Sequence, residues 1–509
     1  MVSNDELVDN FLKLAVVHYS SAPDNGPRRF AKAAHSLREN PELKTSNIYT
    51  AAATGQIDHL QKLLDSNPDS IDIKGGPLDW EPLLYCTYAR VPGYSTLEAA
   101  RLLLKRGANP NVHFVSNNQY IFTALTGAFG EGEGGPVVQP PHPEYIELCT
   151  LLLEHGANPN DSQAAYNRCF QEDNTCLELL LKYGLNTSHK NNWKLQNEDG
   201  LQPNPVETLH FQFIHAIKSG FTDRVKLLLD HAIDIEKPDN TYETRCKGKK
   251  PLEIAMILGE QQIVKLLIES GAQPVELSDV DRFQMACSQA NVQLAKELLA
   301  TNPEITTDVE SLKYEMLNHA VQRSRHQSLQ LMIDLGFDLN AHNDRTALHE
   351  AAFAGNLEII QLLMDNGADS SLRDSSYLVP AIGFALHAEH HSIVEYLDTM
   401  PMDIYTAAIR GRMKQLQRHI ESNPELINQR FETLRSQRSN NPHDSDWMTP
   451  LAFAVAGNQA EAMTALLNHG ADPTISTDSG LSLSQFSVQM RCHENITEQI
   501  DKALTDRKP

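Results

Sequence analysis

The chain is poor in aromatic residues, in positive charge and in long apolar runs. Aromatic residues make up 6% of its 509 residues, and tryptophan occurs only 3 times. With 43 Lys and Arg against 66 Asp and Glu, the net charge is −23. This balance argues against a nucleic-acid-binding protein, which needs basic side chains to neutralise phosphates, and against binding to anionic membranes. No apolar run approaches the roughly 18 residues of a membrane span, and no signal peptide opens the sequence, so we expect a cytoplasmic protein.

Cysteine is also sparse and unpatterned. The 7 cysteines are scattered, and no two are spaced as a CxxC pair. Most of them fall on apolar faces of expected helices, where cysteine serves as a small hydrophobic residue. This usage is typical of a reducing compartment and predicts neither a disulfide framework nor a zinc site.

The motifs of common enzymes are missing. The Gly-rich run GEGEGG at residues 130–135 lacks the Lys-Ser/Thr pair of a phosphate-binding loop, and neither GxSxG nor HExxH occurs. His387, His390 and His391 have a spacing that could hold a metal on one helix face, but they fall in an expected exposed turn and are interpreted as solvated polar residues. We therefore expect no catalytic residue, no cofactor, no metal and no small-molecule substrate.

What the chain does contain is an internal repeat. LLLKRGANPN at Leu102–Asn111 returns as LLLEHGANPN at Leu151–Asn160, as LLMDNGADSS at Leu362–Ser371 and in related forms along the chain. A variant ends in Asn-Pro, as in LLDSNPDSI at Leu63–Ile71. Both forms are helix stops, because Gly adopts the left-handed conformation that caps a helix and Pro forces the preceding residue out of the helical region.

These phrases recur about every 36 residues, and the chain resembles ankyrin-repeat proteins, whose unit has about 33 residues. The unit Asp344–Asp374 resembles the family consensus most closely. Thr346 is its expected N-cap, Gly355 and Gly367 are its expected helix ends, and His349 is expected to hydrogen-bond within the fold. The stretches FGEGEGGPVVQPPHPE and KGGPLDW are similar to a group of bacterial ankyrin proteins with no established activity.

The resemblance implies an all-α fold: an ankyrin-repeat solenoid of about twelve helix–turn–helix repeats with short β-hairpin fingers. We expect a capping helical pair in residues 1–45, the repeat array in residues 46–478 and capping helices in residues 479–509. Two parts of the array also resemble each other, with NIYTAAATGQIDHLQKLLDSNPDSI at Asn47–Ile71 parallel to DIYTAAIRGRMKQLQRHIESNPELI at Asp403–Ile427. Each is followed by Asp-Trp and then Pro-Leu, which suggests a duplicated block.

In the ankyrin family the loops between repeats form fingers along the concave side, and these loops hold all the tryptophans of this chain. Trp, Tyr and Arg dominate the energetics of protein interfaces, so these loops are candidates for recognition. The alternative, left open here, is that each tryptophan folds down over the next repeat and seals the finger. The residues expected to contact a partner are Trp80, Phe114, Tyr120, Trp193, Tyr242, Arg245, Phe431, Arg435 and Trp447.

One insertion, Glu131–Pro143, interrupts a repeat between its two helices. We expect it to project from the edge opposite the fingers, either as a tolerated surface loop or as a second contact site.

These observations predict a non-catalytic scaffold or adaptor that binds a protein partner with a basic surface on its concave, acidic finger side. The alternatives are a divergent enzyme with a site in the degenerate repeats of residues 162–343, and an inhibitor or exported effector.

Overall fold

The computed structural model describes residues 3–19, 26–116, 120–132, 134–185, 208–231, 233–239, 245–341, 344–437, 443–477 and 479–506. Within these ranges the chain is mainly helical, as the sequence predicts, and its one sheet has two strands. The chain divides into two units, residues 1–256 with 260–275 and residues 257–259 with 276–509. The sequence analysis did not anticipate this division. None of the helices in the described ranges is both long and apolar enough to cross a bilayer.

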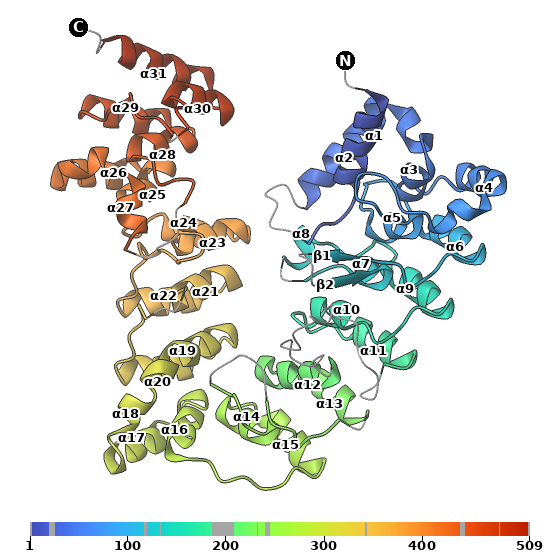
Figure 1. Ribbon diagram of the computed structural model, residues 1–509. Coiled ribbons are helices and arrows are strands. Elements are labelled where there is room, and N and C mark those ends of the chain that lie inside the picture. The colour runs from blue at the N-terminus through green and yellow to red at the C-terminus, as the bar shows by residue number, and fades with distance from the viewer. Residues whose placement is uncertain are drawn as a thin grey trace, which may run out of the picture. The chain divides into compact units, whose positions relative to one another are not determined.

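The first unit is built from short helices that follow one another as hairpins (Figure 1). Its elements are α1 (Asn4–Ala15), α2 (Pro27–Glu39), η1 (Pro41–Thr45), α3 (Ile48–Ala53), α4 (Ile57–Ser66), η2 (Pro68–Asp72), α5 (Pro82–Tyr88), α6 (Leu97–Lys105), β1 (His113–Ser116), β2 (Tyr120–Thr123), α7 (Ala124–Phe129), α8 (Gly135–Val138), α9 (Tyr145–Glu154), α10 (Ser162–Asn167), α11 (Thr175–Lys182), α12 (Thr208–Ser219), α13 (Thr222–Leu229), α14 (Pro251–Ile257) and α15 (Gln261–Glu269). The first helices of successive hairpins pack in the order α3, α5, α7, α10 and α12. Helices α1 and α2 pack on each other, and α1 contacts α3.

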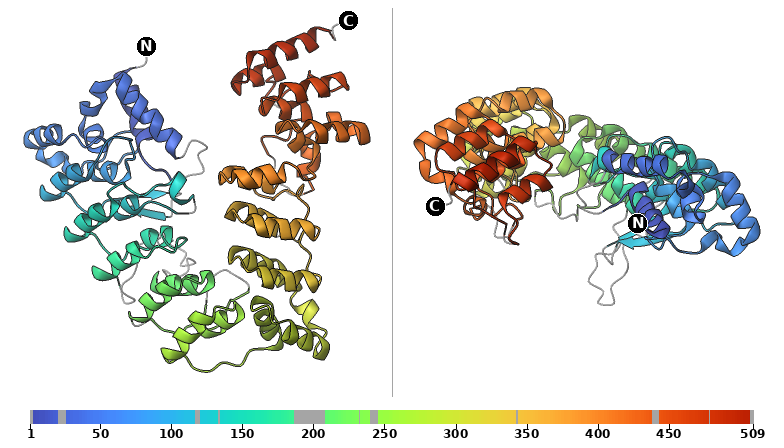
Figure 2. Two further views of the ribbon diagram at one scale, coloured as in Figure 1. Left: turned by 180° about the vertical axis from the view of Figure 1, so that it is seen from behind. Right: turned by 90° about the horizontal axis from the view of Figure 1, so that it is seen from above.

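The second unit repeats this arrangement, and the view from behind shows α16 to α23 following one another (Figure 2). Its elements are α16 (Asp279–Ser288), α17 (Val292–Thr301), α18 (Ile305–Asp308), η3 (Glu310–Leu312), α19 (Lys313–Gln322), α20 (His326–Asp334), α21 (Ala347–Ala354), α22 (Leu357–Asp365), α23 (Ala381–His387), α24 (His391–Leu397), α25 (Ile404–Ile409), α26 (Met413–Ser422), η4 (Pro424–Asn428), α27 (Phe431–Arg435), α28 (Pro450–Ala456), α29 (Ala460–Asn468), α30 (Leu483–Gln489) and α31 (Glu494–Asp506). At its end, α30 packs on α28 and α31 packs on α29.

The hairpin of α21 and α22 shows why the sequence folds in this way. Gly355 ends α21 at φ 78° and Gly367 follows α22 at φ 95°, so both predicted helix stops are confirmed. His349 is 1% exposed, and its Nδ1 accepts the backbone N–H of Thr346 at 3.1 Å. Its Nε2 therefore carries the proton and donates to the carbonyl of Val379 at 3.2 Å. The histidine ties the start of one hairpin to the loop before the next, which is the structural role expected for it.

A recurring asparagine fixes the spacing between successive fingers. The Nδ2 of Asn111 donates to the carbonyl of Gly156 at 3.0 Å, and its Oδ1 accepts the N–H of Asn158 at 2.8 Å. The same pair of bonds is made by Asn340 to Gly367 and Asp369, and by Asn428 to Gly470 and Asp472. The Asn at the end of the repeated phrase is thus a bridge between neighbouring repeats.

The insertion at Glu131–Pro143 is exposed in its middle, where Val137 is 68% exposed, but its two ends are buried. Glu131 and His142 are 6% and 2% exposed, and the Glu131 carboxylate pairs with the buried guanidinium of Arg168. The buried Arg90 donates from Nε to the carbonyl of Pro140 at 2.9 Å. Both ends of the insertion are therefore anchored, because buried arginines need the acceptors that it supplies.

Candidate recognition surface

The finger tryptophans are buried. Trp80 is 6% exposed, and its ring stacks on Phe114 with centroids 4.5 Å apart. The rings of Tyr85 and Tyr88, both on α5, lie 5.5 Å and 5.1 Å from it. Trp80 thus packs against the hairpin that follows it, as the sealing alternative describes.

The corresponding residues of the second unit are buried in the same way. Trp447 is 6% exposed and meets the ring of Phe486 edge-on at 5.1 Å. Phe431 is 2% exposed and lies edge-on to Tyr405 at 5.4 Å. These side chains hold fingers in place rather than lying on an exposed surface.

Both predicted arginines are also buried, Arg245 at 5% and Arg435 at 7% exposed. Arg435 donates from Nε and Nη2 to the two carboxylate oxygens of Asp446, at 3.0 Å each. This bidentate pair fastens α27 to the end of its finger. Trp193 and Tyr242 lie outside the described residues.

Two of the predicted residues remain half-exposed on the hairpin of β1 and β2. Phe114 and Tyr120 are of intermediate exposure, and Phe114 stacks on Phe122 of the facing strand at 5.4 Å. The strands pair antiparallel, with Phe114 opposite Phe122 and Ser116 opposite Tyr120. This hairpin is the finger on which part of the predicted surface stays accessible.

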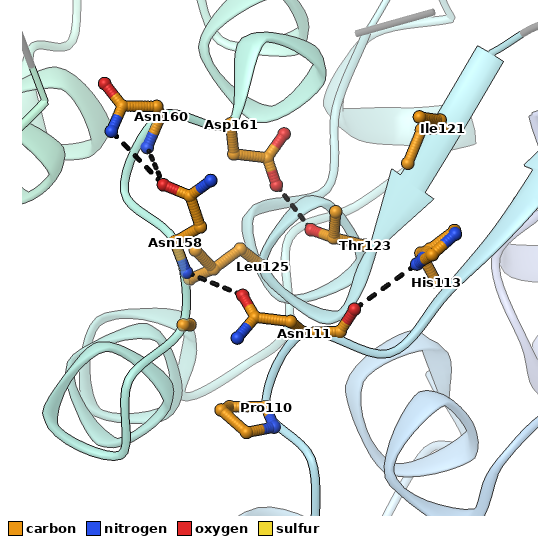
Figure 3. Close-up of a pocket in the computed structure, with 10 residues that line it drawn as sticks. Pro110, Asn111, His113, Ile121, Thr123, Leu125, Asn158, Asn160 and Asp161 are labelled. Atoms are coloured by element: carbon orange, nitrogen blue, oxygen red, sulfur yellow. Dashed lines mark hydrogen bonds between the residues drawn. The ribbon is translucent and has the colours of Figure 1, made fainter. Parts of the chain in front are cut away.

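A small depression lies at the base of this hairpin, between β2 and the next finger (Figure 3). Its volume is about 70 Å³, well below the roughly 300 Å³ at which small-molecule sites begin. Asp161, the N-cap of α10, lines it and accepts hydrogen bonds from the hydroxyls of Thr123 and Thr126 and from the N–H of Ala164. Burial raises the pKa of the Asp161 carboxyl. Because these donors already occupy its oxygens, Asp161 acts as a helix cap.

Of the three neighbouring histidines, His387 and His391 are exposed, and His390 contacts the preceding hairpin. His390 is the N-cap residue of α24, and its Nε2 lies 3.0 Å from the carbonyl of Phe353. Within the described residues, no group of 3 or more His, Cys, Asp and Glu side chains is placed to hold a metal ion.

Sequence reasoning missed two aromatic clusters on the first helices of the hairpins. In the first unit, the centroids of neighbouring rings lie 5.2 to 6.3 Å apart, along α10 and the turn after it and along α12 and the turn after it. The members of this cluster are Tyr166, Phe170, Phe211, His215 and Phe221. Only Phe170, at 38%, is clearly exposed.

The second cluster joins α21, α23 and the loop between α22 and α23. We call Phe353, Tyr377, Phe384 and His387 the aromatic patch. The ring centroid of Phe384 lies 6.5 Å from that of Phe353 and 6.3 Å from that of Tyr377. The ring of His387 stacks on that of Phe353, with centroids 6.5 Å apart. Phe353 is 48% exposed and Tyr377 is 61% exposed. A large apolar side chain with this exposure is unusual on a first helix whose other apolar residues are buried.

A signal for Phe353 was present in the sequence. Leu348, Ala351 and Ala352 form the buried stripe of α21 at the spacing of a helix face, and Phe353 falls one position outside it. An apolar residue displaced from the buried stripe of a helix indicates a surface function, whereas the predicted contact residues were all placed in loops.

Family comparison supports the repeat. The family described as ankyrin repeats (3 copies) matches residues 202–277 and 283–374, and the ankyrin repeat family matches residues 446–478. These stretches of the chain match ankyrin repeats. The matched units include Asp344–Asp374, from which the resemblance was first drawn.

Curated relatives point the same way. The chain is 23% identical over 390 residues to transient receptor potential cation channel subfamily A member 1 of Homo sapiens, covering 73% of this chain and 31% of the channel. It is 22% identical over 295 residues to an ankyrin repeat protein of Fowlpox virus, covering 50% of this chain and 41% of the viral protein. It is also 30% identical over 176 residues to an ankyrin repeat and KH domain-containing protein of Caenorhabditis elegans, covering 34% of this chain and 6% of that protein.

The chain thus spans less than half the length of each of these relatives. They are eukaryotic or viral, and so they do not support the expected bacterial source.

Proposed function

We propose that the protein is a non-catalytic scaffold or adaptor that binds a protein partner through its fingers and the adjoining first helices. The observation that carries this proposal is the aromatic patch, in which a finger residue, Tyr377, and a first-helix residue, Phe353, are both exposed and joined through Phe384. Pre-ordered helices lose little conformational entropy on binding, which helps an open surface reach useful affinity.

The proposal includes the hairpin of β1 and β2, where Phe114 and Tyr120 are half-exposed. Four buried residues then have a supporting role, because they hold in place the fingers that present the surface: Trp80, Phe431, Arg435 and Trp447.

The proposal also includes a solenoid of about twelve repeats across residues 46–478, with capping helices in residues 1–45 and 479–509. The net charge of −23 favours a partner with a basic surface. The 7 cysteines are scattered, with no CxxC pair, which fits a reducing compartment such as the cytoplasm.

The test is affinity capture from lysate of cells that express the protein, followed by mass spectrometry. We expect a stoichiometric protein partner with the wild type, and loss of that partner with the double variant Phe353→Ala/Tyr377→Ala. Val488→Ala is the matched control, because Val488 is an exposed apolar residue of the same unit (64%) outside the patch. Recovery of no partner, or a metal or cofactor bound stoichiometrically to the purified protein, would overturn the proposal.

A further inference from the structure

The aromatic patch differs from the cluster in the first unit in how much apolar surface it leaves open. Phe353 and Tyr377 each expose about half of their area or more, at 48% and 61%. In the other cluster four of the five rings are only of intermediate exposure. The two exposed rings lie on either side of the buried Phe384, which is 6% exposed, and exposed apolar side chains gathered in this way are candidates for an interaction site. Of the two clusters, the patch is therefore the one with an uncovered face.

The charges around the patch are predominantly negative. Residues 344–400 contain nine Asp and Glu, against two arginines and no lysine. One of the arginines, Arg373, is committed to Asp403 through bonds of 2.9 to 3.2 Å. The segments that carry the first-unit cluster, residues 161–182 and 208–230, hold six acidic and five basic residues. Asp398 is in turn paired with Arg410 and Arg412, so eight acidic residues remain against Arg345, and the excess of negative charge is still larger here than in the segments of the first-unit cluster.

The second arginine lies within the patch and shows what kind of group this surface accepts. The guanidinium of Arg345 stands over the ring of Phe384, 4.8 Å from its centroid. It lies 3.8 Å from the carboxylate of Asp344 and 3.6 Å from that of Glu350. One cation thus faces an aromatic ring between two carboxylates.

The same two carboxylates act on a neighbouring phenol. The pKa of Tyr314, on the preceding first helix, is raised by burial and by the charges of Glu350 and Asp344. A hydrogen bond with the backbone of Arg345 opposes this rise, so the two carboxylates and Arg345 act together on the side chain of Tyr314.

We propose that the aromatic patch binds a basic segment of the partner, one that places an apolar side chain on Phe353 and Tyr377 and sets Lys or Arg side chains beside Asp344 and Glu350. This inference rests on the proposed function and names the chemistry of the partner. Charge complementarity selects it: an acidic segment would meet the like charges of residues 344–400, and a wholly polar basic segment would leave the two exposed rings uncovered. Cation–π contact with the tyrosine and phenylalanine faces would add to the attraction.

The test uses three synthetic peptides and the full chain. The first peptide is an amphipathic helix of Leu and Lys, the second replaces every Lys with Glu, and the third replaces every Leu with Ser. We expect the Leu–Lys peptide to bind, measured by fluorescence anisotropy, and the other two to bind at least about tenfold more weakly.

Variants assign the binding to the patch. Phe353→Ala and Tyr377→Ala should each weaken the Leu–Lys peptide about tenfold, as expected of exposed interface anchors, and Glu350→Gln about threefold. The controls are Val488→Ala for the apolar variants and Glu358→Gln for the charge variant. Glu358 lies on α22 of the same hairpin, with its side chain 83% exposed. Four of these side chains are exposed and that of Glu350 is 15% exposed, so circular dichroism melting should show that the variants remain folded.

Several results would overturn the inference. Equal binding of the Glu peptide would contradict a basic partner segment. Unchanged affinity in Phe353→Ala and Tyr377→Ala would show that the peptide binds outside the aromatic patch. A concentration-dependent dimer that Phe353→Ala abolishes would assign the patch to a second copy of the chain instead.

Capture from lysate separates this inference from the proposed function. A partner retained by Phe353→Ala/Tyr377→Ala would leave the function standing and overturn the inference. Failure of the wild type to capture any partner would overturn the function itself.

Discussion

Two segments of the chain share their sequence and fold alike, but they diverge in the finger that follows. Asn47–Ile71 forms α3, α4 and most of η2, and Asp403–Ile427 forms α25, α26 and most of η4. In each, the tyrosine of the first helix fixes the start of the finger. Tyr49 donates to the carbonyl of Ile73 at 3.1 Å, and Tyr405 donates to that of Gln429 at 3.2 Å.

The divergence begins two residues beyond these carbonyls, where Gly75 after the first segment corresponds to Phe431 after the second. A Cβ at Gly75 would lie 2.3 Å from the hydroxyl oxygen of Tyr49. The glycine lets the chain turn back at once, and Gly75 and Trp80 exchange backbone hydrogen bonds of 3.0 and 3.1 Å. Phe431 instead begins α27, and a longer finger follows before Trp447. One position thus separates a tight finger from a long one on the same hairpin.

The two segments also differ in how their first helices are capped. Asn47 caps α3 with its side chain, accepting from the N–H groups of Tyr49 and Thr50. The corresponding Asp403 caps α25 but is paired with the buried Arg373. This pair lowers the pKa of Asp403 even though burial opposes the lowering. The second segment therefore contains a buried charge pair where the first has a neutral cap.

Replacing the two tryptophans is expected to have the largest effect. Trp80→Ala and Trp447→Ala should each reduce the free energy of unfolding by about 3–5 kcal/mol, because both side chains are 6% exposed and their removal leaves a cavity. Hydrogen exchange at the level of peptides would locate each loss, in α5 for Trp80 and in α28 for Trp447. Ile73→Ala, at a position 50% exposed, is the control. If Trp447→Ala melted like the wild type but bound its partner weakly, Trp447 would instead be a contact residue.

The next effect comes from the charged cap. Arg373→Met should destabilise the second segment by about 3 kcal/mol, because it leaves the carboxylate of Asp403 buried without its cation. Adding Asp403→Asn, which installs the residue that the first segment carries, should restore most of this loss. A double-mutant cycle by denaturant unfolding measures the coupling. Additive effects of the two substitutions would show that the pair contributes nothing beyond its separate residues.

Much of this fold could be predicted from sequence because it is local. Helix stops such as Gly355 and Gly367, the cap at Thr346 and the role of His349 follow from residue type and spacing within one repeat. The insertion at Glu131–Pro143 could not be predicted in this way. The anchoring of its two ends depends on Arg90 and Arg168, which lie in other repeats and carry no local signal.

The candidate surface was harder to predict, because an aromatic residue in a loop can face either way. Trp80 and Trp447 look exposed in sequence, since no helical period surrounds them, but the stacking partners Phe114 and Phe486 come from the next repeat. Phe353 was overlooked for the opposite reason, since it lies in a helix that also supplies the core. Its displacement from the buried stripe was the usable signal.

The smallest predicted effect concerns acid and the hairpins that follow the two tryptophans. The first is bonded to a buried histidine, His142, which lies in the next repeat, just before α9. His142 Nε2 lies 2.9 Å from the hydroxyl of Thr96, which itself donates to the carbonyl of Cys86 at 2.7 Å. The Nδ1 of His142 accepts the N–H of Glu144 at 3.1 Å. The imidazole therefore donates from Nε2 only, and a proton on Nδ1 would face the N–H of Glu144.

Burial and the charge of Arg90 lower the pKa of His142 to about 3. The unfolded chain binds this proton near pH 6.5, whereas the folded chain excludes it until about pH 3, so acidification between these values favours unfolding. The first hairpin should lose about 2 kcal/mol between pH 7 and pH 5 from this residue. Asp403, with its lowered pKa, destabilises the second segment only when the pH falls below the ordinary carboxyl range near 4. Hydrogen exchange in α5 and α28, measured as a function of pH, compares the stability of the two hairpins. His142→Gln should abolish the difference between their pH dependences above pH 5. If α5 in the variant kept the wild-type dependence on pH, the titrating group would lie elsewhere.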